Sequence, residues 1–284
     1  TGPNDGEEPM AFKTIVVHVD ADTNRDERLN IAEALVRRHD GHLIGLHPSE
    51  PPYLPPSLGE LAGPVEADMV EAQRQAAQSR AEELHQLFEE RLQASGLSVE
   101  WRAEEGEPST VLARHGRYAD LLLIPQGEEG AVFPDASLVE RVILDGGCPV
   151  MVVPRSGRFP KTGRTVLVAW KDSRESARAV RAALPLMVDA EKVILLQVDP
   201  PDGSDAQVID KATHLARHGI NADAHHTVSA GVPIGEVLLS SVADHDADCL
   251  VMGAYGHTRL REWVLGGATR SVLESMTVPT LLST

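Results

Sequence analysis

Short apolar runs alternate with longer amphipathic stretches along most of the chain. The runs are rich in β-branched residues, as in TIVVHVD (Thr14–Asp20) and TVLVAWK (Thr165–Lys171). Each of these two runs is followed by a polar turn and then by apolar residues at helical spacing. Because the runs are almost continuously apolar, they are typical of strands that helices cover on both faces. The pattern predicts an α/β protein with a mainly parallel sheet.

The two halves of the chain repeat the same series of elements. The first helix of each half has an apolar face, which carries Leu29, Ala32, Leu35 and Val36 in the first half and Ala177, Val180, Ala183, Leu184 and Met187 in the second. A second strand follows in each half, His42–His47 and Lys192–Val198, and later a Gly-x-Pro helix start, Gly106–Pro108 and Gly231–Pro233. Each half ends with two more strands, which are Leu121–Pro125 and Pro149–Pro154 in the first half and Cys249–Gly253 and Pro279–Ser283 in the second. The repeat predicts two tandem flavodoxin-like domains over residues 11–154 and 164–284, each with a five-stranded, mainly parallel sheet. Arg155–Gly163 is the expected linker.

The first half is longer than the second. The offset between matched segments is 151 residues at the first strand and 130 at the last, a difference of 21. We expect the extra residues in the proline-rich stretch Pro48–Pro64. A long amphipathic helix, about Ala67–Ala94, follows, and its apolar face carries Val70, Ala77, Ala81, Leu84, Phe88 and Leu92. The polar segment Thr1–Pro9 is expected to be a tail outside the fold.

Charge and composition narrow the possible functions. The net charge of −17 argues against a general nucleic-acid binder, which needs a basic surface. Residues 164–284 hold 11 Lys and Arg against 15 Asp and Glu, a net −4, while the remainder carries −13, so the second half is the better place for a phosphate. Without an apolar run of about 18 residues or an export signal, we expect no membrane span and a cytoplasmic protein. Cys148 and Cys249 are interpreted as buried thiols in a reducing compartment.

A glycine-rich segment in the second half has the features of an anion site. Gly253-Ala-Tyr-Gly256 follows a predicted strand, and nine residues later Gly266-Gly267-Ala268-Thr269 opens a predicted helix. Ligands of parallel sheets sit beyond the carboxyl ends of the strands. Glycine lets the backbone approach a ligand closely, and a helix N-terminus offers free N–H groups to an anion. Together these parts predict a triphosphate and ribose site, whereas ordinary turn glycines are the simpler alternative.

The segment resembles the nucleotide loop of the universal stress proteins, Gly-x2-Gly-x9-Gly-Ser/Thr. The first-strand pattern, the repeat and the final Val-Pro strand are similar as well, so the resemblance covers about residues 11–284. It implies a tandem universal stress protein of the adenine nucleotide α-hydrolase-like fold that binds ATP, with Mg²⁺ as a candidate ion, and acts in stress response. The ligand-binding residues that it implies are Lys171, Val198, Gly253, Gly256, His257, Gly266, Gly267, Ala268 and Thr269. Among these, Val198 would lie beside adenine, and Gly253, Gly256, Gly266, Gly267 and Thr269 would face phosphate and ribose.

Two departures from the family pattern bear on the ligand. Gly267 stands where the family has Ser or Thr, so one hydroxyl contact is missing, although Thr269 follows. Lys171 stands where the family has Asp. This lysine either removes a contact to the nucleoside or adds a cation near phosphate.

The first half has a degraded loop. Gly127 and Gly130 remain, but Glu140 occupies the place of the next glycine, and Glu128 and Glu129 add charges that repel phosphate. We therefore expect one nucleotide per chain, in the second half. The family's strand-end acid is kept here as Asp20, for which a helix or turn cap is an equal alternative.

Other polar patterns are weaker. Arg259 and Arg261 lie in the long loop, where a salt bridge to Glu262 competes with a phosphate contact. The pair His214 and His218 has helical metal spacing but no third ligand, so a solvated face is favoured. His225 and His226 would point to opposite faces of a strand. Asp172-Ser173 is expected to cap the following helix.

Three functions remain open. The first is an ATP-holding sensor with little turnover. The second is a nucleotide hydrolase or transferase, for which His257 and Asp172 are the nearby candidates to act on a metal-positioned water. The third is a structural stress protein without nucleotide. We expect the two domains to form an intrachain pseudo-dimer through Val150–Val153 and Thr280–Ser283, because bare edge strands invite pairing. A homodimer is also open, and the sequence does not identify a protein partner.

Overall fold

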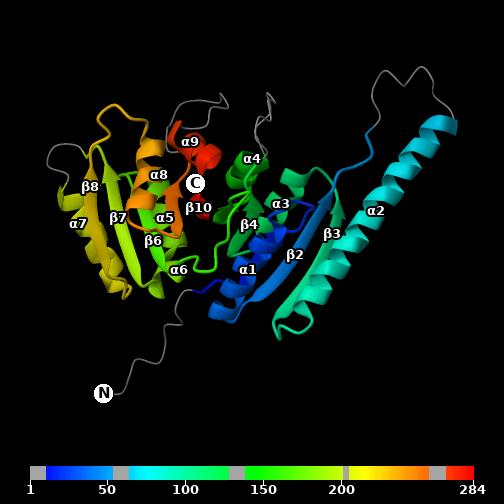
Figure 1. Ribbon diagram of the computed structural model, residues 1–284, viewed down its shortest axis with the longest axis horizontal. Coiled ribbons are helices and arrows are strands. Elements are labelled where there is room, and N and C mark those ends of the chain that lie inside the picture. The colour runs from blue at the N-terminus through cyan, green and yellow to red at the C-terminus, as the bar shows by residue number, and fades with distance from the viewer. Residues whose placement is uncertain (1–10, 54–63, 128–137, 201–204, 256–266) are drawn as a thin grey trace.

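The computed structural model shows one continuous ten-stranded sheet with helices on both faces (Figure 1). It describes residues 11–53, 64–127, 138–200, 205–255 and 267–284. Strand and helix alternate along the chain in both halves, as the hydrophobic pattern predicts.

Each half contributes five strands. The first half contains β1 (Thr14–His18), α1 (Arg25–His39), β2 (His42–Ser49), α2 (Pro64–Leu92), β3 (Ser98–Glu105), α3 (Pro108–Gly116), β4 (Leu121–Pro125), α4 (Leu138–Asp145) and β5 (Val150–Val153). The second half contains β6 (Thr165–Trp170), α5 (Arg174–Ala182), α6 (Leu184–Val188), β7 (Lys192–Val198), α7 (Asp205–Arg217), β8 (Ala222–Thr227), α8 (Ile234–Asp244), β9 (Cys249–Gly253), α9 (Gly267–Ser275) and β10 (Thr280–Ser283).

The two halves join through their final strands. The strand order is β3-β2-β1-β4-β5-β10-β9-β6-β7-β8, and every pair is parallel except β5 with β10. In that antiparallel pair Leu281 lies opposite Met151, so a pseudo-two-fold axis passes between them. This arrangement confirms the predicted intrachain pairing. It also removes two sheet edges that would otherwise be open to other chains.

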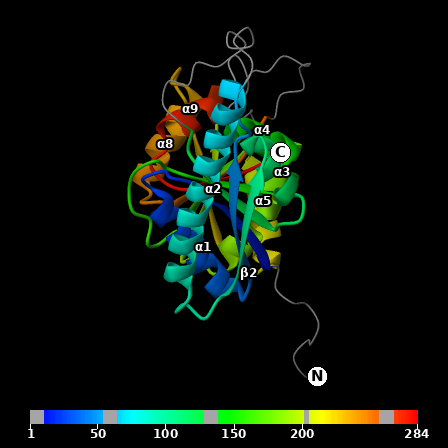
Figure 2. The same ribbon diagram turned by 90° about the vertical axis from the view of Figure 1, so that its right-hand side faces the viewer.

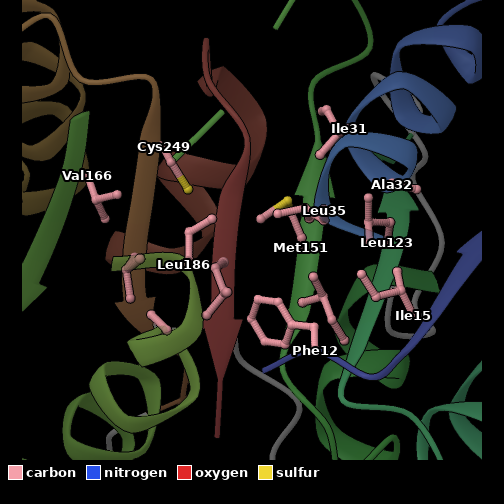
Figure 3. Packing of buried hydrophobic residues seen from close by; sticks show 14 of the residues in the cluster. Phe12, Ile15, Ile31, Ala32, Leu35, Leu123, Met151, Val166, Leu186 and Cys249 are labelled. Atoms are coloured by element: carbon pink, nitrogen blue, oxygen red, sulfur yellow. The ribbon is translucent and has the colours of Figure 1, made fainter. Parts of the chain in front are cut away.

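Side chains on the two faces of the sheet form two hydrophobic layers. One lies under α1, α2, α5, α6 and α7, and the other under α3, α4, α8 and α9. The first layer runs across the junction, since Met151 and Phe12 of the first half belong to the same cluster as Leu186 and Cys249 of the second (Figure 3). Burial of this shared layer makes the two halves one packed unit.

Two helical regions differ from the sequence expectation. The single helix expected around Ala177–Met187 is broken, with α5 ending at Ala182 and α6 starting at Leu184. Pro185 explains the break, since proline lacks the N–H that an unbroken helix needs. The extra length of the first half is also not confined to Pro48–Pro64. Much of it lies in α2, which has 29 residues against 13 in the matching α7.

The cysteines are unpaired, as expected. Cys249 is fully buried and Cys148 is partly buried, and burial raises the pKa of both thiols. Among the described helices, none has the length and apolar character needed to cross a membrane.

Candidate functional site

The carboxyl ends of β6, β7 and β9 meet at one edge of the second half. Ala169 of β6 lies opposite Leu196 of β7 and opposite Met252 of β9, so the residues that follow these strands are neighbours. Lys171 is exposed directly after β6, and the half-buried Val198 ends β7. The structure therefore brings Lys171, Val198 and the β9 end together, as expected from the sequence.

Gly253 ends β9 against the first turn of α5. A Cβ added there would lie 2.6 Å from the backbone carbon of Glu175 and from the backbone nitrogen of Ser176. Real side chains do not tolerate such an approach to backbone atoms, so this position requires glycine for packing alone. The role of Gly253 is thus structural before any ligand is considered.

The start of α9 has a different environment. Gly267 is exposed, and no described atom lies within 4 Å of the place where its Cβ would be. Ala268 is half-buried, and Thr269 is only 4% exposed, so its hydroxyl is less accessible than the sequence reading implies. The open approach at the start of α9 is therefore at Gly267. The other residues proposed from the loop, Gly256, His257, Arg259, Arg261 and Gly266, lie outside the described residues.

Two lysines surround the end of β6. The Lys171 side chain is exposed, while its backbone nitrogen donates to Ser176 Oγ at 3.2 Å. Lys211 of α7, which the sequence analysis did not single out, places its Nζ 4.5 Å from the centroid of the Trp170 ring. Burial lowers the pKa of Lys211, and the charge of Asp172 opposes that shift. Lys171 and Lys211 therefore place two cations at these strand ends, beside the exposed carboxylates of Asp172 and Asp199.

The sequence analysis also missed three buried polar groups near this edge. Within the described part of the chain, Trp170 Nε1, Gln197 Oε1 and the Tyr255 hydroxyl have no hydrogen-bond partner. Trp170 and Gln197 lie opposite each other on β6 and β7. The backbone of Tyr255 has a φ of +65°. Burial raises the pKa of the Tyr255 hydroxyl, and the negative charge of Glu140, from the other half, raises it further. Its position between the two loop glycines was the available sequence signal.

In the first half, the side chain of Arg28, which comes from α1, lies at the end of the corresponding strand β1. Arg28 is fully buried, and it contacts Asp20 at 2.6 Å and Asp22 at 3.1 Å. Its Nε also donates to the His18 carbonyl oxygen at 3.0 Å. Asp20 accepts a hydrogen bond from the Asp22 N–H at 3.1 Å. It therefore caps the turn after β1, which is one of the two roles expected from the sequence. The structure adds that the same carboxylate is neutralised from within the chain.

The hydrogen-bond pattern corrects the expected loop correspondence. Gln126 N donates to Val153 O and Ala254 N donates to Ser283 O, so Gln126 matches Ala254 and Pro125 matches Gly253. Gly127 is therefore not the counterpart of Gly253. The expected match of Gly127 with Gly253 was wrong because glycine spacing alone does not contain the strand register.

The helix after the loop needs the same correction. Since Met151 pairs with Leu281, the offset there is 130 residues, which matches Val139 with Thr269 and Glu140 with Arg270. Glu140 therefore lies in the first turn of α4 and does not take a glycine's place. The first half nevertheless lacks the hydroxyl, because buried Val139 replaces Thr269.

The weaker patterns remain minor. Ser173 caps α5 by accepting the Ser176 N–H at 3.2 Å, as expected. His214 and His218 have ring centroids 4.9 Å apart, and His225 contacts His245. The described residues contain no group of three or more His, Cys, Asp or Glu placed to hold a metal ion.

Comparisons with known proteins agree with this architecture. The model of the Universal stress protein family matches residues 11–154 and 163–283. A universal stress protein from Archaeoglobus fulgidus has a similar structure, with a TM-score of 0.74 and 15% identity over 95% of this chain and 97% of that one. A putative universal stress protein from Pseudomonas aeruginosa gives a TM-score of 0.62 and 16% identity over 96% and 93%. A search of curated proteins found no relative.

Proposed function

Because the chain belongs to the universal stress protein family, we propose that it binds an adenine nucleotide, ATP in the first instance, in its second half. In this proposal it serves the stress response as a sensor or regulator rather than as a fast enzyme. The observation that carries the proposal is the exposed Gly267, which opens α9 beyond the carboxyl end of the sheet and has no described atom within 4 Å of the place where a Cβ would be.

The start of α9 supplies the phosphate contact in this proposal. The first N–H groups of a helix have no partner within the helix, and the helix dipole favours an anion there. A side chain at Gly267 would stand in the way of a phosphate, which explains glycine at a position where packing does not require it. Lys171 adds a cation at the same edge, so we assign it to the phosphates rather than to the nucleoside.

In this proposal the end of β7 contacts the adenine. Val198 is half-buried and packs, with Tyr255 and Ala169, against the layer under α8 and α9. An apolar side chain at a strand end offers a flat contact to a base. The polar edge of the base needs partners, and the unpaired Tyr255 hydroxyl, which lies on the same face of the sheet as Val198, is a described candidate.

The first half lacks these features and is proposed to be nucleotide-free. Arg28 already binds Asp20, the acid that the family uses at this strand end. Val139 replaces Thr269, and Pro125 replaces Gly253. Binding there would require breaking the Arg28–Asp20 contact, whose arginine is fully buried.

The rival function is hydrolysis of the bound nucleotide. Asp172 is an exposed carboxylate beside β6 and is the described candidate for a base. Its charge interacts with that of Lys211, and the described residues contain no cluster of His, Cys, Asp or Glu that could hold a metal ion to position a water for it. We therefore expect turnover far below the roughly 1–1000 per second typical of enzymes.

Analysis of nucleotide released from denatured purified protein separates the alternatives. Bound ATP without turnover supports the sensor. Bound ADP with sustained hydrolysis, abolished by His257→Ala, supports the enzyme. A protein that carries no nucleotide and takes up none from solution refutes the proposal.

A further inference from the structure

The outer end of the first half carries a groove that the nucleotide site does not use. It lies between α2 and β3 and has a volume of about 530 Å³. Figure 2 looks at this end of the molecule, where α2 lies in front of the sheet. The lining residues are His85, Gln86, Phe88, Glu89, Glu90, Leu92, Gln93, Val99, Glu100 and Trp101.

The charged residues that line this groove are acidic. Three of its lining residues are glutamates and none is lysine or arginine. Glu100 is paired with Arg102 at 2.7 Å, and Glu89 lies 3.2 Å from His85 Nε2. Glu89 and Glu90 are both exposed, and they supply the negative charge on the helix side. The occupant that this surface fits is therefore positively charged.

The floor of the groove is aromatic and rigid. Trp101 stacks on His85 with ring centroids 5.3 Å apart and planes 12° apart, and it also contacts Phe88. Phe88 packs directly over Gly45 of β2, where an added Cβ would lie 2.6 Å from its ring. Val99 is 37% exposed beside them. The long methylene stems of lysine or arginine pack well on such a surface while their charged ends reach carboxylates.

The groove borders an open strand edge. All eight residues of β3 pair with β2 on one side, and β3 is the terminal strand of the sheet on the other. In the described part of the chain no strand pairs with that outer edge, so its N–H and C=O groups face outward in a row. An extended peptide can add to such an edge, taking affinity from backbone hydrogen bonds and specificity from alternate side chains.

We propose that the β3 edge and the α2–β3 groove bind a basic, extended segment of a partner protein as an added strand. Its backbone pairs with β3, and alternate lysine or arginine side chains lie over Trp101 toward Glu89 and Glu90. A second copy of this chain does not fit, because the net charge of −17 would bring like charges together. A small polyamine would use the carboxylates but leave the strand edge unused.

Fluorescence anisotropy with synthetic peptides tests this proposal on the full-length protein. The probe is a labelled octapeptide of alternating lysine and valine, and its control carries N-methyl groups on alternate residues so that it cannot pair with a strand. We expect the first to bind and the second not to bind. Glu89→Gln/Glu90→Gln should weaken binding roughly fivefold or more, because two charge contacts are lost.

A matched double variant on the same helix, Glu71→Gln/Glu83→Gln, removes equal charge outside the groove and should keep affinity within about twofold. Circular dichroism checks that both variants keep their helix content. Equal weakening in both variants, equal binding of the N-methylated peptide, or no binding of the first peptide would overturn the proposal. Spermine binding as tightly as the peptide would also overturn it, in favour of a small-cation site.

Discussion

Gly253 and Gly267 belong to the same loop motif, yet their surroundings differ. At Gly253 an added Cβ meets the backbone of α5 at 2.6 Å, while at Gly267 it meets no described atom within 4 Å. Gly253→Ala should therefore lower the free energy of unfolding by about 1–3 kcal/mol. Gly267→Leu should leave it nearly unchanged, because leucine is a good helix former at an exposed position. Urea unfolding of both variants checks this contrast, and equal losses would show that packing fixes both glycines.

Burial of His18 should make the stability of the fold depend on pH. Burial lowers its pKa from 6.5 to about 4, against the opposing charge of Asp20. Between these values the unfolded chain binds a proton that the folded chain excludes. Stability therefore falls as pH decreases from 6.5 to 4, by up to about 3 kcal/mol from this residue. Asp20, whose pKa is lowered, loses its contribution only below its ordinary value of 3.8.

The contribution of His18 can be isolated by comparing variants. The strand register matches His18 with Ala169 of the second half, which makes His18→Ala the informative substitution. The difference in unfolding free energy between wild type and variant should shrink as pH falls from 6.5 to 4. A difference that stays constant over this range would show that His18 does not titrate as described.

Individual site residues were only partly predictable from the sequence. The positions of Lys171 and Val198 at strand ends were predictable because strand ends can be read from apolar runs; their contact with a ligand stays a prediction. The Arg28–Asp20 pair was not found, because a charged residue at a helical core position looks like a solvated one in sequence. Tyr255 and Gln197 were missed for a related reason. Their burial depends on packing between elements, which local pattern does not encode.

At the scale of elements, the end of α9 depends on a residue from the other half. Gln126 Nε2 donates to the carbonyl oxygens of Leu273 at 2.7 Å and of Glu274 at 3.2 Å, in the last turn of that helix. Gln126→Ala should cost about 1–2 kcal/mol, since it leaves those carbonyls unpaired. Gln126→Glu should cost more, because a carboxylate at a helix C-terminus opposes the dipole. Thermal unfolding ranks the two, and a glutamate variant as stable as wild type would contradict this role.

Most elements follow from hydrophobic spacing, and the exceptions have physical causes. The strands Leu121–Pro125 and Cys249–Gly253 coincide with the expected bounds because their runs are continuous and buried. The break between α5 and α6 was missed because apolar spacing continues across Pro185. The first-half loop was misaligned because glycine spacing was compared without strand register. Hydrogen bonds across the sheet supply that register, and a sequence pattern does not contain it.

At the scale of the whole molecule, the shared sheet predicts cooperative unfolding. The β5–β10 pair and a common hydrophobic layer join the halves, with Met151 and Leu281 fully buried at the junction. Fluorescence, which reports Trp101 in the first half and Trp170 and Trp263 in the second, and far-UV circular dichroism should give coincident urea transitions. Two separated transitions would mean that the halves fold independently despite the continuous sheet.

Isothermal titration of ATP into the purified, nucleotide-free chain tests the central claim most directly. The account predicts one site per chain, binding lost in Gly267→Leu, and binding retained when the same change is made at Gly127. A side chain at Gly267 would block phosphate at the start of α9, whereas Gly127 lies in the half where Arg28 already neutralises Asp20. Two sites per chain, or unchanged affinity in Gly267→Leu, would contradict it.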